Sequence, residues 1–430
     1  MSRRRVVITG AGVVSPIGTG WFAFCDGLRT ARPGVDTIRS FDASAFPTRI
    51  AGEVRDLEAG RVALPDGERA ALLRDRKSLF GLVAAREALA RAFAGRSLPC
   101  AAERLAVIVA AGLEVFHLED LAPHVTGEQI DGTTLLAALD AAPPGALLQI
   151  PADLGARCIL GETGGAGLFA VNLSACAAGT QAVGEATLAV RDGVADVALA
   201  GGYDSMINPL GVGGFCLLEA LSTSNDRRGE ASRPFDALRD GFVLGEGAGM
   251  VVLEELEAAR ARGATVLAEV LGYATTLDAY RVTDPAPDAA GAIAAMRGAL
   301  ADAGVAPEEI DYINAHGTAT RKNDPAETAA IHGVFGAAAR RVPVSSTKSQ
   351  IGHLIGAAGA VELCATLFAL REQLLPATIN LTHPDPECDL DYVPLDPRPA
   401  RVRTAISNSF GFGGQNATIV VGLPPDPGGE

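Results

Sequence analysis

The stretch VNLSACAAGTQAVGEA (171–186) joins an apolar, β-branched run to a run of small residues. The segment GLFAVNL (167–173) predicts a buried strand because nearly all of its residues are apolar. The residues after it recur at helical spacing: Val183, Ala186, Thr187 and Val190. Cys176 therefore lies where a predicted strand passes into a predicted helix. A helix N-terminus favours the thiolate form of a cysteine, so Cys176 is either a reactive nucleophile or an inert buried thiol.

The same alternation of short apolar runs and alanine-rich segments continues along the chain. Predicted strands fall at 4–14, 104–112, 196–202, 267–274, 310–315, 342–348, 404–410 and 417–423, with long helices at 290–304 and 354–375. This order predicts an α/β fold. The strands are apolar on both faces, which is typical of a sheet covered by helices on both sides.

The chain divides into two predicted halves. Charged, helical residues near 254–270 separate residues 1–258 from residues 259–430, and both parts have similar strand and helix content. A weak internal repeat supports a duplication, because Cys176 and His353 each precede a small-residue helix start. Residues 113–150 follow neither pattern, and we expect them to cap a site or to form a dimer edge.

Composition excludes several classes of protein. The 430 residues are 48% hydrophobic and carry a net charge of -15, which disfavours nucleic-acid binding. The seven cysteines form no CxxC pair, so we expect neither a zinc site nor a disulfide framework. No run of about 18 apolar residues occurs, so we expect a cytoplasmic protein without a membrane span. No metal or redox cofactor is indicated.

Two further stretches carry groups suited to catalysis. His316 follows the predicted strand 310–315, and Lys348 and His353 flank a turn before a small-residue helix. A cysteine and two histidines at the ends of predicted strands form a plausible nucleophile with acid/base partners. The alternative is that these are a turn histidine, an exposed lysine and a helix-cap histidine.

Two acidic residues and two aromatic residues lie close to these groups in sequence. Asp324 and Glu327 are spaced i, i+3 at a predicted helix start, where they are placed to orient basic groups. Phe410 and Phe412 alternate with glycines in SNSFGFGGQNA (407–417). That composition predicts either a flexible aromatic gate or a bulged strand end.

These motifs resemble those of the β-ketoacyl-[acyl carrier protein] synthases, most closely the elongating type II enzymes. The resemblance covers nearly the whole chain and includes VVITGAGVVSPIG, SACAAG, VALAGGYDSMINPLGVGGF, NAHGTAT, SSTKSQIGHLIGAAGA and SNSFGFGGQNA. It implies a duplicated thiolase-like fold with five layers, α-β-α-β-α. It also implies a homodimer, or a heterodimer with a related ketosynthase-like subunit.

The resemblance implies a role for each residue that matches a family motif. Cys176 takes the acyl chain as a thioester, and His316 and His353 bind the malonyl thioester carbonyl and support its decarboxylation. Lys348, paired with Glu362, holds the surrounding charge and hydrogen-bond network.

The remaining motif residues have supporting roles in the family. Asp324 and Glu327 match acids that lie behind the catalytic groups. The backbone N–H groups of Cys176 and Phe412 form an oxyanion hole, and Phe410 and Phe412 line or gate the pocket. The reaction needs no cofactor in the enzyme, because the carrier protein holds the phosphopantetheine arm.

The acyl carrier protein that the resemblance implies is acidic, so a basic patch is expected to receive it. Arg74, Arg76 and Lys77 are the candidates, and solvated helix charges are the alternative interpretation.

The sequence also departs from the family. Ser174 stands where threonine is usual, and 113–150 lacks an expected glycine-rich turn. These departures favour a specialised polyketide or polyene pathway at least as much as fatty acid elongation. Two other functions stay open: a non-condensing partner subunit that only shapes the acyl pocket, and a cysteine hydrolase.

Overall fold

The computed structural model describes residues 3–57, 62–65, 69–112, 118–141 and 152–424. Within these residues the main sheet has 11 strands in the order β13-β12-β16-β17-β11-β1-β10-β9-β5-β8, with β2 (Gly18–Thr19) paired to β1. The N-terminal half supplies β1 (Val6–Ser15), β5 (Leu105–Ala111), β8 (Phe169–Asn172), β9 (Val197–Ser205) and β10 (Glu246–Glu255). The C-terminal half supplies β11 (Ala268–Leu277), β12 (Tyr312–Asn314), β13 (Val344–Ser345), β16 (Thr404–Gly411) and β17 (Gln415–Gly422).

The two halves repeat one topology. In each half, the first strand pairs with the fifth, the fifth with the fourth, the fourth with the second, and the second with the third. The first two of these pairings are antiparallel and the last two are parallel in both halves. The halves meet where β1 pairs with β11 over three residues. The duplication suggested by the sequence is therefore present in the strand order, while the boundary at residue 258 stays a prediction.

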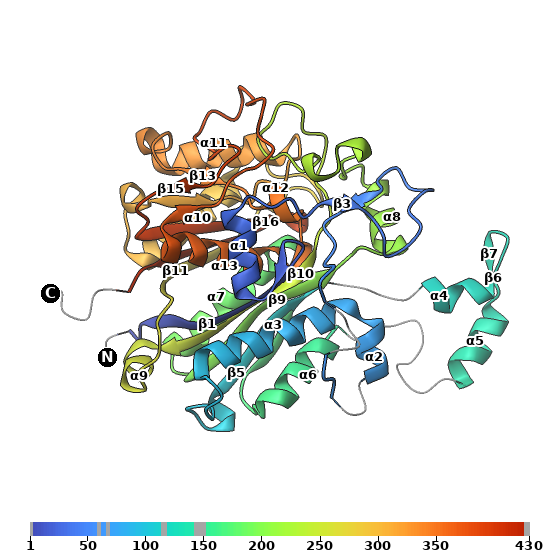
Figure 1. Ribbon diagram of the computed structural model, residues 1–430, viewed down its shortest axis with the longest axis horizontal. Helices are drawn as coiled ribbons and strands as arrows, with labels where there is room; N and C mark the ends of the chain where they lie inside the picture. The colour runs from blue at the N-terminus through green and yellow to red at the C-terminus, as the bar shows by residue number, and fades with distance from the viewer. Residues whose placement is uncertain (1–2, 58–61, 66–68, 113–117, 142–151, 425–430) are drawn as a thin grey trace.

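Helices cover the sheet halves in layers (Figure 1). The helices concerned are α3 (Arg76–Phe93), α6 (Leu154–Thr163), α7 (Ala178–Arg191), α10 (Ala290–Ala303), α11 (Asn323–Phe335) and α13 (Ala358–Glu372). Helices α3 and α6 pack on the outer face of the N-terminal half, and α10, backed by α11, covers the C-terminal half. Helices α7 and α13 contact each other and both halves of the sheet, so they form the central layer. This arrangement confirms the predicted α-β-α-β-α fold.

Small residues allow the central layer to pack closely. A Cβ at Gly179 of α7 would lie 2.8 Å from the backbone nitrogen of Ala360 in α13. A Cβ at Gly359 would meet the Thr180 hydroxyl at 2.1 Å. The alanine and glycine run that follows Cys176 is therefore required by the approach of two helix backbones.

Most of the predicted strands are confirmed, with three differences. Of the predicted strand at 342–348 only β13 (Val344–Ser345) is a strand, and Lys348 begins a short helix. Strand β10 was not predicted, because its glycines and terminal glutamates interrupt the apolar pattern, yet nine of its ten residues are buried. Strand β8 is only half-buried, so the prediction of a buried strand at 167–173 is wrong. The physical reason is its position, since β8 ends the sheet and has a neighbour only in β5.

The segment expected to cap a site projects from the body of the molecule. Its described part comprises α4 (Leu118–Leu121), η3 (Ala122–His124), β6 (Val125–Thr126), β7 (Gln129–Ile130) and α5 (Gly132–Ala141). These elements lie to one side of the layered body in Figure 1 and none of their residues lines the Cys176 cavity. The expected cap over the chain's own site is therefore not formed by 118–141; residues 113–117 and 142–150 lie outside the described residues.

Among the described residues, no helix combines the length and the apolar character needed to span a membrane.

Candidate active site

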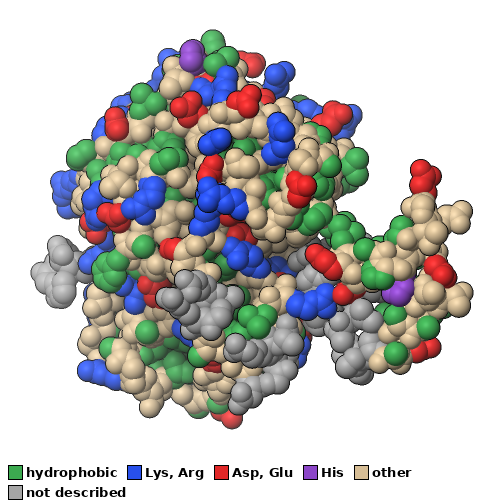
Figure 2. Space-filling view, turned by 45° about the vertical axis from the view of Figure 1, so that its right-hand side comes forward, with side chains coloured by type: hydrophobic (Ala, Val, Ile, Leu, Met, Phe, Trp, Pro, Cys, Tyr) green, Lys and Arg blue, Asp and Glu red, His purple; other side chains and the backbone are tan. Residues whose placement is uncertain are grey.

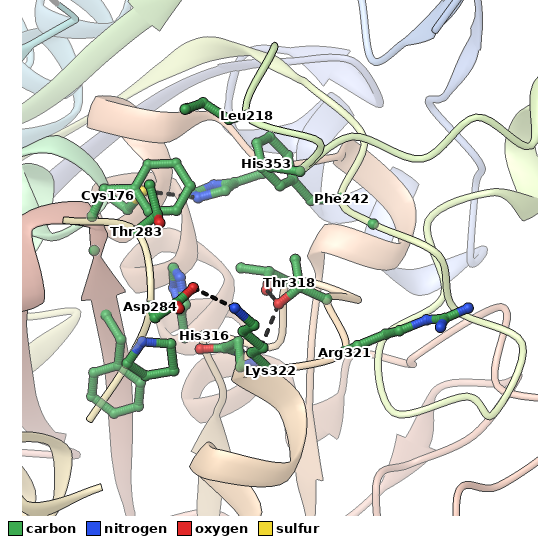
Figure 3. A pocket seen from close by; sticks show the side chains of 18 of the residues that line it. Cys176, Leu218, Phe242, Thr283, Asp284, His316, Thr318, Arg321, Lys322 and His353 are labelled. Atoms are coloured by element: carbon green, nitrogen blue, oxygen red, sulfur yellow. Dashed lines mark hydrogen bonds and ion pairs between the residues drawn. The ribbon is translucent and has the colours of Figure 1, made fainter. Parts of the chain in front are cut away.

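Cys176 lines a cavity of about 270 Å³ whose other lining residues come from both halves of the chain (Figure 3). It belongs to the 3₁₀ turn η4 (Ala175–Ala177), between edge strand β8 and central helix α7. Ala175 has a φ of 52°, a left-handed conformation that costs energy in a non-glycine residue and is held by the surrounding packing. This sharp turn presents the thiol to the cavity, whose lining includes both candidate histidines.

The imidazole of His353 is oriented toward this thiol. Its Nε2 lies 3.1 Å from the Cys176 sulfur, and its Nδ1 accepts a hydrogen bond from the Ile355 N–H at 3.3 Å. Because Nδ1 is an acceptor, the ring proton of the neutral imidazole is on Nε2. His353 therefore presents an N–H donor to the sulfur and to whatever binds beside it.

His316 faces the same space and is held by a carboxylate behind it. Its ring centroid lies 5.3 Å from that of His353. The Glu327 carboxylate accepts hydrogen bonds from the backbone N–H groups of His316 and Gly317, each at 2.8 Å. Lys348 Nζ lies 3.4 Å from His316 Nδ1 and donates to the His316 carbonyl at 2.6 Å. These contacts again leave the proton on Nε2, directed into the cavity.

Lys348 pairs with Glu362, as predicted, and both side chains are 1% exposed. Burial lowers the pKa of His316 and of His353 well below the usual value, and the neighbouring Lys348 charge lowers both further. Both imidazoles are therefore neutral near pH 7. The site offers two N–H donors without a histidine cation.

The expectation of a readily formed thiolate at Cys176 is wrong for this resting structure. Burial raises the pKa of the Cys176 thiol to about 11, although the Phe412 N–H and the Lys348 charge act in the opposite direction. Desolvation of the anion outweighs the field of the helix end. The thiol is therefore protonated at neutral pH until a substrate takes its proton.

Alkylation of Cys176 by iodoacetamide is expected to accelerate about tenfold per pH unit between pH 7 and pH 9, because only the thiolate reacts. Intact mass measured over time gives the rate, with Cys176→Ala identifying the reactive site. A rate that levels off below pH 8 would contradict the raised pKa.

Asp324 serves a different purpose from Glu327. Its carboxylate accepts a hydrogen bond from the Phe235 N–H at 2.8 Å and lies 3.7 Å from Arg239. Asp324 therefore does orient a basic group, as expected from its spacing. Glu327 instead holds the backbone N–H groups of His316 and Gly317.

The two predicted gate residues, Phe410 and Phe412, also line the cavity. Phe410 is on β16, with its ring 5.9 Å from that of His316. Phe412 is in the turn η9 (Phe412–Gly414), with its ring 6.3 Å from Phe215. The position of Gly411 between them is restricted, since a Cβ there would lie 3.2 Å from the Cys176 backbone nitrogen. Gating by these rings stays a prediction.

Replacing Glu327 by glutamine is expected to shift the backbone of His316, and with it the imidazole, without removing the imidazole from the protein. The amide keeps one acceptor and turns an N–H₂ group toward a backbone N–H, so the free energy of unfolding should fall by about 1–3 kcal/mol. The kcat for malonyl decarboxylation should fall about 10–100-fold through misplacement. Denaturant titration and CO2 release measure the two effects, with exposed Glu308→Gln as the control. Wild-type kcat in Glu327→Gln would contradict the assignment.

The basic residues predicted to bind the carrier protein do not line the Cys176 cavity. Lys77 is 2% exposed and pairs with Asp75 at 2.6 Å, so its part in the predicted docking patch is wrong. Arg76 binds the buried Glu246 carboxylate, and Arg74 contacts Asp120. Figure 2 shows Lys and Arg interspersed with Asp and Glu on one face, without a single large basic patch. Docking at Arg74 and Arg76 stays a prediction, with both side chains already engaged.

Several lining residues were not singled out from the sequence. Phe242 packs edge-on against the His353 ring at 5.3 Å, and Thr318 and Thr320 lead from His316 toward the cavity mouth. At the mouth, Lys322 pairs with Asp284 at 2.7 Å (Figure 3). The two threonines lie in the NAHGTAT motif, two and four residues after His316, and their position there was the available signal.

The part of the chain that the structure describes holds no cluster of three His, Cys, Asp or Glu side chains arranged for a metal ion.

Comparison with known proteins agrees with this geometry. The family model described as beta-ketoacyl synthase, N-terminal domain, matches residues 3–259, and that of the C-terminal domain matches residues 267–382. The 3-oxoacyl-[acyl-carrier-protein] synthase 2 of Coxiella burnetii is 42% identical over 98% of this chain and 99% of its own length.

Two solved structures extend the comparison. The ishigamide ketosynthase/chain length factor superposes with a TM-score of 0.84 at 38% identity, covering 98% of this chain and 100% of that chain. AntDE:AntF, a type II PKS acyl-carrier protein in complex with its ketosynthase, gives a TM-score of 0.84 at 31% identity with the same coverage. The chain belongs to the β-ketoacyl synthase family.

Proposed function

We propose that this chain catalyses a decarboxylative Claisen condensation between an acyl thioester held on Cys176 and a malonyl thioester held on a carrier protein. The observation that carries the proposal is the convergence of one thiol and two neutral imidazole N–H donors on one cavity. A cysteine hydrolase would instead need a base beside the thiol. Here the Nδ1 atoms of both histidines are occupied as acceptors, and both protons are on Nε2.

The first half-reaction transfers the acyl group. The Cys176 sulfur attacks the thioester carbonyl, the bond to the pantetheine sulfur breaks, and the thiol proton leaves with that sulfur. Developing negative charge on the carbonyl oxygen is stabilised by the backbone N–H groups of Cys176 and Phe412, as in other preorganised oxyanion holes. This transfer removes the proton that burial otherwise retains on the thiol.

The second half-reaction uses the histidines. The malonyl carboxylate leaves as CO2, and its bonding electrons form an enolate whose oxygen accepts hydrogen bonds from His316 and His353. The carbanion attacks the acyl carbonyl, a carbon–carbon bond forms, and the bond to Cys176 breaks; the released thiolate takes a proton from water and regenerates the thiol. Neutral donors suit this step because they stabilise the enolate oxygen without protonating it strongly. The ion pair between Lys348 and Glu362 keeps the electric field around the two imidazoles fixed.

The substrates arrive on an acyl carrier protein in this proposal, and the phosphopantetheine arm enters between Thr318, Thr320 and Phe412. A type II carrier protein bound to its ketosynthase in the AntDE:AntF structure supports this choice of partner. The fatty acid and polyketide pathways both stay open, since the curated relative is named 3-oxoacyl-[acyl-carrier-protein] synthase 2 and one of the similar solved structures is a type II PKS complex. We propose no cofactor bound by the chain itself.

The chain also has a surface suited to a second subunit. Strand β8 ends the sheet, and Leu168 and Leu173 beside it are 43% and 47% exposed. An open strand edge with apolar neighbours is a pairing site. We therefore propose a dimer, either of two identical chains or with a related ketosynthase-like chain, in cytoplasmic solution.

The test supplies acyl-carrier and malonyl-carrier protein together and measures the β-ketoacyl product by mass, with CO2 release in parallel. Carbon–carbon bond formation with one CO2 per product supports the proposal. Free fatty acid without a condensed product would instead identify a hydrolase, and no reaction of the chain with any acyl donor would favour a non-condensing subunit.

A further inference from the structure

We propose that Asp204 is a positioning residue for His353, holding from the opposite half of the molecule the turn that carries this imidazole. Asp204 is near the end of β9, is 0% exposed, and its Oδ2 accepts a hydrogen bond from the Gly356 N–H at 2.8 Å. The role in catalysis rests on the function proposed above, while the contact itself does not.

The internal repeat shows why this position matters. In both halves a 3₁₀ turn leads into the central helix: η4 before α7, and η8 (Ile355–Ala357) before α13. In the C-terminal half the short helix α12 (Lys348–Ile351) lies between the third strand and this turn. In both turns the first residue has a left-handed φ, 52° at Ala175 and 45° at Ile355. Gly356 is therefore the counterpart of Cys176, at the same place in the second turn.

The backbone nitrogen of the second residue in each turn, Cys176 or Gly356, lies beside a different group in the two halves. The Cys176 backbone nitrogen lies close to Gly411, where an added Cβ would approach it to 3.2 Å, and Cys176 lines the cavity. The Gly356 backbone nitrogen faces the carboxylate of Asp204 instead. In the second half a carboxyl group of the chain thus accepts the backbone N–H that corresponds to the Cys176 N–H of the first.

Three glycines leave room for this carboxylate and for the turn, because a Cβ at any of them would collide with a neighbouring atom or crowd it. A Cβ at Gly112 would lie 1.8 Å from Asp204 Oδ1, and a Cβ at Gly356 would lie 3.1 Å from Oδ2. A Cβ at Gly202 would lie 2.7 Å from the Gly356 carbonyl oxygen. The ends of β5 and β9 therefore pack directly on the turn, and the contact is built into the sheet.

The hydrogen bond between Asp204 and Gly356 acts on His353 through the neighbouring residue Ile355. Ile355, which precedes Gly356, donates its N–H to His353 Nδ1, and that bond sets the tautomer with Nε2 directed at Cys176. Since Ile355 is in an unfavourable backbone conformation, the turn needs an external partner to stay in place. Asp204 supplies that partner at the adjacent N–H.

The experiment compares Asp204→Ala, which removes the acceptor, with Asp204→Asn, which keeps an acceptor of the same shape and removes the charge. We expect decarboxylation by Asp204→Ala to fall about 100-fold in kcat with little change in KM, and by Asp204→Asn to fall less than about tenfold. Val197→Ala, a buried change at the far end of β9, controls for general loss of packing. Equal losses in Asp204→Ala and Val197→Ala at matched folded fraction would overturn the proposal.

A second readout does not depend on the condensation reaction. Asp204→Ala and Asp204→Asn both lack the carboxylate, so a difference between them in the rate of Cys176 alkylation by iodoacetamide at pH 8 reports the position of the His353 N–H beside the sulfur. We expect Asp204→Ala to alkylate several-fold more slowly than Asp204→Asn, because a displaced imidazole no longer donates to the thiolate. Equal alkylation rates in the two variants would overturn the proposal even if the protein proves to catalyse another reaction, and Asp204→Ser replaces Asp204→Ala in the comparison if the alanine variant does not fold.

Discussion

Replacing Cys176 by alanine is expected to abolish condensation, lowering product formation by at least about 10³-fold, because Cys176 supplies the one thiol among the described residues that line the cavity. Decarboxylation of malonyl-carrier protein should persist in part, since the two imidazoles that stabilise the enolate are untouched. The two activities respond differently because the thiol holds the acyl chain, whereas the imidazoles stabilise the enolate.

Intact mass spectrometry measures the first effect directly. Wild-type protein mixed with a panel of acyl-carrier proteins should gain the mass of one acyl group, and Cys176→Ala should gain none. Cys100→Ala, a change at a half-exposed thiol outside the cavity, is the matched control and should acylate normally. Acylation of Cys176→Ala would remove Cys176 as the nucleophile. Absence of any acyl gain in the wild type would point to a silent thiol that needs a partner subunit.

Replacing either His316 or His353 by alanine is expected to lower the rate of malonyl decarboxylation about 10²–10³-fold, the usual loss when one oxyanion donor is removed. The effects should differ on the acyl-transfer step. His353 Nε2 is 3.1 Å from the Cys176 sulfur, whereas His316 makes its contacts with Lys348 and Glu327. We therefore expect His353→Ala to alter the rate of Cys176 acylation more than His316→Ala does.

Radiolabelled CO2 release from malonyl-carrier protein measures this loss, and single-turnover acylation separates the two steps. His332→Ala is the control, because His332 pairs with Asp389 on the outer helix α11, outside the cavity. Both activities should be unchanged in it. If the double variant of His316 and His353 still condensed at a near-normal rate, the enolate would be stabilised by other groups and the proposed mechanism would be wrong.

Much of the fold was predictable because local patterns and the global fold agree. The apolar strands and alanine-rich helices gave the α/β class, and the position of Cys176 at a strand-to-helix junction is the position found in η4. Strand β10 was missed because burial comes from its neighbours β1 and β9 rather than from its own pattern of residues. The half-burial of β8 likewise depends on its place at the sheet edge.

The candidate site divides in the same way. Sequence identified Cys176, His316, Lys348 and His353, because each follows a predicted strand or precedes a helix start, where functional groups collect. It did not show that burial would raise the pKa of the thiol to about 11. Desolvation depends on what packs around a group from every side, and only the three-dimensional structure contains that.

Sequence by itself therefore determined the class of fold, the repeated strand–turn–helix junctions and the residue types that carry the chemistry, because these depend on neighbours along the chain. The tertiary structure alone decided which of these groups meet. It buried Lys77 in an ion pair with Asp75, directed Glu327 to the backbone of His316, and brought Asp204 from the N-terminal half to Gly356 in the other. Those contacts join residues up to 152 positions apart, and chain-local patterns hold no information about distances of that kind.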